Sequence, residues 1–76
     1  MKQYVKDFAD DCIRELTEFE NFAFSIADQY GKMTDSQREE IKKEYGSKKK
    51  QIESVLELCE LGYLTDFEAV KKIAAV

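Results

Sequence analysis

The stretch Tyr-Gly-Lys-Met-Thr-Asp-Ser-Gln at residues 30–37 separates two long segments whose apolar residues recur with the period of an α-helix. Gly31 can adopt the left-handed conformation that ends many helices. Thr34 is a favoured N-cap residue, and Gln37 stands three positions later, as in a capping box. A connection this short predicts that the helices on its two sides run antiparallel, as a helical hairpin.

The segment before this turn predicts a helix from Gln3 to Gln29. Its apolar residues cover an arc of about 200° on the helical wheel, wider than the roughly 100° needed to face one neighbour. We therefore expect at least two helices to pack against it. Glu15 and Glu20 lie within or beside the apolar arc, and we expect their carboxylates to reach water at its edge.

The segment after the turn predicts a second helix, from Asp35 to Leu61, with a narrower apolar stripe. Gly46 and Ser47 lie in its middle, and a glycine inside a helix costs about 1 kcal/mol. We favour one helix that bends at Gly46. In the alternative, the helix breaks there, Ser47 caps a new helix, and the chain folds back into a compact four-helix monomer that buries its aromatic side chains.

The last stretch predicts a short third helix, from Asp66 to Ala74. Gly62 suits the end of the second helix, and Thr65 with Glu68 forms another capping box. Leu64 precedes this cap, where it can pack against Ala69 as a hydrophobic staple. The third helix covers the start of the first one, and its apolar residues are Phe67, Val70, Ile73 and Ala74. The predicted fold is a single all-α domain over residues 1–76, a long antiparallel hairpin with a short C-terminal helix, which self-associates into a bundle.

The hairpin end near the turn has more apolar surface than one neighbouring helix can cover. Phe22 and Phe24 lie at opposite edges of the apolar arc, so a single helix cannot bury both. Exposed apolar patches on small proteins mark interfaces. We expect an association surface, for a second copy or for a foreign protein, made of Phe19, Phe22, Phe24, Ile26, Tyr30, Ile41 and Tyr45.

Charge is unevenly distributed along this acidic chain, whose net charge is −4. Residues 1–31 carry three basic and seven acidic side chains, whereas residues 32–50 carry seven basic and four acidic ones. The overall acidity argues against direct nucleic-acid binding. A helix-turn-helix centred on Gly46 is also disfavoured, because Lys42 and Ser47 occupy positions where that motif needs small or apolar residues. No apolar run approaches a membrane span, and two cysteines suit a reducing cytoplasm.

The residue types argue against catalysis. There is no histidine, which removes the commonest general base, and the carboxylates lack the Glu-x-x-His spacing of di-metal bundles. Cys12 and Cys59 lie on separate helices, each within an apolar stripe, so we expect two buried free thiols, no metal and no cofactor. We favour a solvated run for Lys48, Lys49 and Lys50, with the Lys48 stem on the apolar stripe. The alternative is that these lysines form an anion contact beside the tyrosines.

These observations favour a non-enzymatic binding protein. We expect a helical interaction module or a small inhibitor, of the kind that bacteria and their phages encode. Its acidic face would suit the nucleic-acid channel of an enzyme such as a defence nuclease. The alternative is a homo-oligomer that holds a small anionic ligand, such as a nucleotide, between lysines and tyrosines at a subunit seam.

Overall fold

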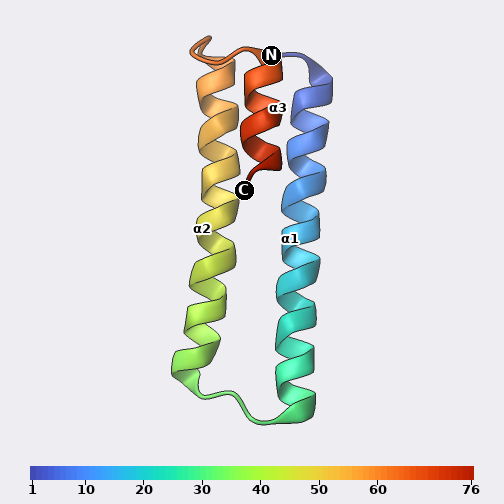
Figure 1. The fold of residues 1–76 in the computed structure, drawn as a ribbon, viewed down its shortest axis with the longest axis vertical. Helices are drawn as coiled ribbons and strands as arrows, with labels where there is room; N and C mark the ends of the chain where they lie inside the picture. The colour runs from blue at the N-terminus through green and yellow to red at the C-terminus, as the bar shows by residue number, and fades with distance from the viewer.

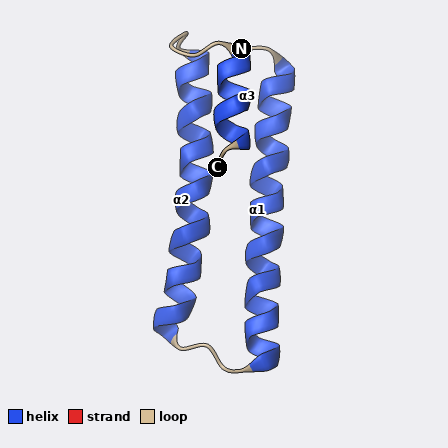
Figure 2. Ribbon diagram, viewed as in Figure 1, coloured by secondary structure: helices blue, strands red, loops and turns tan.

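The computed structural model describes residues 1–76 and contains three helices and no strands. The helices are α1 (Gln3–Tyr30), α2 (Asp35–Glu60) and α3 (Asp66–Ala74). α1 and α2 form a long hairpin, and α3 lies between them at the end that also holds the N-terminus (Figure 1). The rod measures 46 × 19 × 14 Å, and non-helical residues are confined to the chain ends and the two turns (Figure 2). The predicted all-α hairpin with a short third helix is confirmed.

Two capping boxes start α2 and α3 where the sequence predicts them. The Gln37 amide donates to the Thr34 hydroxyl at 3.2 Å, and the Thr34 amide donates to the Gln37 side-chain oxygen at 3.0 Å. The same pair of bonds joins Thr65 and Glu68, at 3.1 and 3.2 Å. Each box satisfies amides at a helix start that have no partner within the helix. Leu64 packs against the cluster that contains Ala69, as the predicted staple requires.

The two long helices end differently. Gly62 has φ +89°, and the Tyr63 amide donates to the Leu58 carbonyl at 2.9 Å, so α2 ends in a Schellman motif. Gly31 was predicted to end α1 in the same left-handed conformation, and this is wrong: it is extended, with φ 167° and ψ 154°. The reason is the N-cap of α2. Thr34 has an extended backbone (φ −73°, ψ 159°) at the start of α2, so the chain must leave the helical conformation before it reaches Thr34.

α2 is unbroken through Gly46, so the alternative of a chain that folds back into four helices is wrong. A break would leave about four amides and four carbonyls without helical partners. Each lost hydrogen bond costs about 1 kcal/mol, which together exceeds the cost of about 1 kcal/mol for a helical glycine. The half of the hairpin near the turn therefore keeps only two helices.

The core has two layers, and each takes one buried residue from each helix. The outer layer contains Val5, Cys59 and Ala69, and the inner layer contains Ala9, Ile52 and Ile73. α1 thus packs against both α2 and α3, as the width of its apolar arc predicted. All six buried residues of the chain belong to these layers, so the core occupies only the α3 end of the rod.

Candidate interaction surface

Four large apolar side chains form an exposed line along the turn-proximal half of α1. Phe19, Phe22, Ile26 and Tyr30 are spaced three or four residues apart, which places them on one helical face. Their exposed fractions are 59%, 63%, 39% and 81%. We call these four residues the tip stripe, and the turn of residues 31–34 the hairpin tip.

The tip stripe continues the face of α1 that α3 covers nearer the N-terminus. Cys12 lies seven residues before Phe19 on the same face and lines a cavity together with Ile73 of α3. α3 has nine residues and α1 has 28, which correspond to lengths of about 13 and 42 Å. α3 therefore covers this face of α1 at one end and leaves it uncovered along the tip stripe.

The other three residues predicted for this surface are partly buried. Phe24 is partly buried, and its ring centroid is 5.3 Å from the guanidinium carbon of Arg38 on α2. Arg38 also pairs with Asp28 of α1, at 3.1 Å. Ile41 and Tyr45 of α2 are partly buried as well. The structure thus divides the seven predicted residues into four on an exposed line and three that are partly buried.

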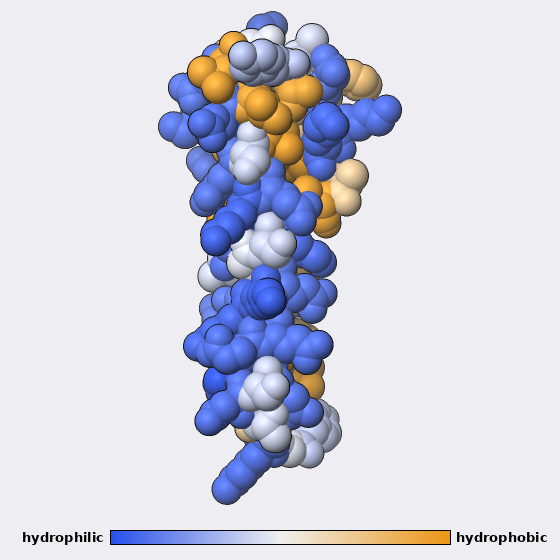
Figure 3. Space-filling model, turned by 90° about the vertical axis from the view of Figure 1, so that its left-hand side faces the viewer, coloured by the Kyte–Doolittle hydropathy of each residue, from blue (hydrophilic) through white to orange (hydrophobic).

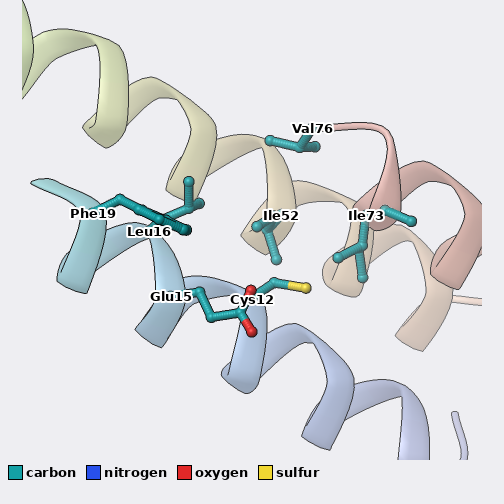
Figure 4. Close-up of a pocket in the computed structure, with 8 residues that line it drawn as sticks. Cys12, Glu15, Leu16, Phe19, Ile52, Ile73 and Val76 are labelled. Atoms are coloured by element: carbon teal, nitrogen blue, oxygen red, sulfur yellow. The ribbon is translucent and has the colours of Figure 1, made fainter.

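A cavity of about 150 Å³ opens where α3 ends. Leu16 and Phe19 of α1, Ile52 of α2, and Val76, which follows α3, surround the same space (Figure 4). Phe19 belongs both to this cavity and to the tip stripe, so the two form a continuous apolar surface. Beside it, a shallow hollow is lined by Phe19 and Phe22 and by two carboxylates, those of Glu15 and Glu18.

The three consecutive lysines have different surroundings. The Lys48 ammonium lies 5.8 Å from the ring centroid of Tyr45. Lys49 Nζ lies 3.9 Å from Glu20 Oε1, and this ion pair joins α2 to α1 with exposed fractions of 24% and 18%. Glu20 therefore does not reach freely into water as expected, whereas Glu15 is exposed. Lys50 is exposed and makes no ion pair.

Both cysteines are free thiols. Burial is the main cause that raises the pKa of the Cys59 thiol, and its contact of 3.5 Å with the Asp66 carboxylate adds to the effect. Burial also raises the pKa of the half-buried Cys12 thiol, with smaller contributions from Glu15 and Asp11. A raised pKa lowers the thiolate fraction at neutral pH, so both cysteines are weak nucleophiles.

No group of three His, Cys, Asp or Glu side chains is arranged to hold a metal ion. None of the helices combines the length and the apolar character needed to cross a membrane.

A second set of exposed apolar residues lies at the α3 end and was missed by the sequence analysis. Phe67, one of the apolar residues expected in the third helix, is 74% exposed. The core line of α3 runs through Ala69 and Ile73, and Phe67 lies about 200° around the helix from Ala69. Apolar atoms gather over this end in Figure 3, above a mostly hydrophilic face of α2. The exposed large apolar residues here are Met1, Tyr4, Leu58, Leu61, Tyr63 and Phe67.

Comparisons with protein families, with characterised proteins and with solved structures find no match to this chain. The function is therefore inferred from the surface itself.

Proposed function

We propose that this protein is a non-enzymatic helical binding module that associates with another protein chain through the tip stripe. The supporting observation is the line of four large apolar side chains, 39–81% exposed, on a face of α1 that α3 does not reach to cover. Together they expose roughly 500 Å² if each offers about 200 Å² when fully accessible. Burying that area is worth on the order of 10 kcal/mol, similar to the association cost of about 4–15 kcal/mol that a partner must overcome.

The test is a comparison of three immobilised proteins: the wild type, Phe22→Glu and Phe67→Glu. Phe22 and Phe67 are similarly exposed, at 63% and 74%, but lie at opposite ends of the rod. We expect the wild type and Phe67→Glu to retain a protein from a lysate of the source cells, or a second copy, and Phe22→Glu to retain neither. Equal retention by all three proteins would refute the tip stripe as the contact.

A narrower form of this proposal is that the protein inhibits a nucleic-acid enzyme. It is supported by the exposed carboxylates of Asp7, Asp10, Asp11 and Glu18 on α1, which could face a basic channel. Charge reversal at Asp7 and Asp10 would then weaken binding to the captured enzyme, and the weakening would decrease with added salt. Unchanged binding would exclude this form and leave the broader proposal intact.

The second candidate is an anionic-ligand site at a subunit seam. It is supported by Lys48, which lies one turn before the core residue Ile52 on the same stripe of α2 and has no carboxylate partner. A nucleotide that binds there would raise the melting temperature of the wild type. Lys48→Ala would lose this shift, and an equal shift in the variant would exclude the site.

A further inference from the structure

We propose that the chain bound by the tip stripe is a second copy of this protein, packed antiparallel. In this dimer, the turn-proximal half of each hairpin covers the part of α1 in the other copy that its α3 leaves uncovered. The inference rests on the proposed function, because it names the occupant of the same surface.

The length of the uncovered face of α1 favours this occupant. Residues 18–30 of α1 continue past the end of α3, which approaches only Phe19 among them, and they span about 20 Å at 1.5 Å per residue. The occupant must therefore be about 20 Å long and apolar on one face. The turn-proximal half of a second hairpin has this length and carries its own tip stripe on the matching face, so the contact is self-complementary, as a twofold interface requires.

The position of α3 selects the antiparallel orientation. α3 stands on the same face as the tip stripe, so two copies packed in parallel would meet α3 against α3. Since a helix is about 10 Å across, that contact would hold the two tip stripes apart. In the antiparallel arrangement, the α3 of each copy lies beyond the hairpin tip of the other, and the stripes can touch.

The spacing of the stripe defines the register. A twofold axis level with Phe24 and Ser25 places Phe22 opposite Ile26 of the second copy and Phe19 opposite Tyr30 of the second copy. In an antiparallel twofold contact, the numbers of paired residues have a nearly constant sum. The sum is 48 for Phe22 with Ile26 and 49 for Phe19 with Tyr30, so one register satisfies the whole stripe. Tyr30 of the second copy then reaches the cavity that Phe19 and Ile73 line.

The charges agree with this register. Glu15 lies one turn before Phe19, Glu18 directly precedes it, and both line the hollow beside it. A parallel dimer would bring these carboxylates close to the same carboxylates of the second copy, which is unfavourable. The antiparallel register brings them close to Lys32 in the hairpin tip of the second copy. Lys32 carries the only charge within the tip, residues 31–34.

The small area buried between the two copies predicts a dimer that dissociates on dilution. Two tip stripes contribute roughly 1,000 Å², and the flanking polar residues bring the total to the low end of the 1,200–2,000 Å² typical of specific interfaces. The antiparallel overlap also predicts an elongated particle, about 65 Å long from the rise per residue, compared with 46 Å for one chain.

The first test is light scattering over a series of concentrations. We expect the wild-type mass to rise towards twice the 8.9 kDa of one chain. Phe22→Glu should stay monomeric, and Phe67→Glu should behave like the wild type. A wild type that stays monomeric at all concentrations would refute the second copy as occupant. It would leave the proposed function open, because retention of a foreign protein tests that separately.

The second test determines the orientation by disulfide formation in a Cys12→Ala, Cys59→Ala background whose fold is verified by circular dichroism. An equimolar mixture of Phe19→Cys and Tyr30→Cys proteins should form the mixed disulfide. Either protein alone should not, because identical positions lie about 16 Å apart along the axis in this register, beyond the roughly 7 Å that a disulfide spans. A disulfide between two Phe19→Cys chains would overturn the antiparallel dimer. If the cysteine-free background does not fold, the wild-type particle length from X-ray scattering decides the orientation.

Discussion

Replacement of glycine by alanine is predicted to have opposite effects at two positions of this chain. Gly46 lies inside α2, whereas Gly62 follows α2 with φ +89°. An added Cβ would meet no atom within 4 Å at either position. Side-chain packing therefore does not distinguish the two substitutions, and the backbone conformation alone decides whether each one stabilises the fold.

The magnitudes follow from the two conformations. In a helix interior, alanine is about 1 kcal/mol more favourable than glycine, so Gly46→Ala should raise the free energy of unfolding by about 1 kcal/mol. At Gly62, the left-handed conformation costs an alanine about 1–2 kcal/mol. The lower entropy of the unfolded alanine chain offsets about 0.4–1 kcal/mol of this cost. Gly62→Ala should therefore lose about 1 kcal/mol, which separates the two variants by about 2 kcal/mol.

Urea unfolding followed by circular dichroism, at one protein concentration for all variants, measures this difference. With a slope of about 1 kcal/mol per molar urea for a small domain, the midpoint should rise by about 1 M for Gly46→Ala. It should fall by about 1 M for Gly62→Ala. The slope itself should not change, because neither substitution alters the surface exposed on unfolding.

Two results would refute this reasoning. A loss of stability in Gly46→Ala would mean that the backbone at this position is not helical, contrary to the unbroken α2. No loss in Gly62→Ala would mean that the turn between α2 and α3 does not need a left-handed residue.

Three further predictions concern the core, a cap and the thiols. Ile52→Ala should lower the free energy of unfolding by about 3 kcal/mol, because Ile52 is 1% exposed; a loss below about 1 kcal/mol in thermal unfolding would contradict tight packing there. Hydrogen bonds from the Thr65 amide and hydroxyl lower the pKa of Glu68 in the folded state. This contribution to stability is present above the unfolded pKa of glutamate and is lost as pH falls through the lowered folded pKa. Stability measured from neutral to acidic pH should therefore fall more steeply in the wild type than in Glu68→Gln, and identical profiles would contradict the assignment. At pH 8, a thiol reagent should modify Cys12 before Cys59, because Cys59 is only 5% exposed; mass spectrometry of the labelled peptides gives the order.

Much of the fold is predictable from short-range signals. The bounds of α3 follow from Gly62 and from the capping box of Thr65 and Glu68, since both act within a few residues. The antiparallel hairpin follows from the short turn and the two apolar stripes. The conformation of Gly31 is less predictable, because glycine is compatible with both the left-handed and the extended conformation.

The parts that local signals did not predict depend on contacts between distant residues. The ion pair between Glu20 and Lys49 joins positions 29 residues apart, and no local pattern indicates it. Phe67 lies on the edge of a short helix, where its burial depends on how α3 is rotated against the hairpin. The tip stripe was partly predictable, because the aromatic surplus is visible in the sequence, but the contact of Phe24 with Arg38 on the other helix was not.

The confinement of the core to one end has a consequence for local unfolding. No residue between Ala9 and Ile52 is buried. The turn-proximal half of the hairpin is therefore held mainly by its own helical hydrogen bonds and by half-exposed contacts. Such regions open at a free energy well below that of global unfolding. Backbone amides near the tip should therefore exchange with deuterium much faster than those beside α3. Any partner that covers the tip stripe would slow this exchange, so the protected amides would map the footprint of the partner before its identity is known.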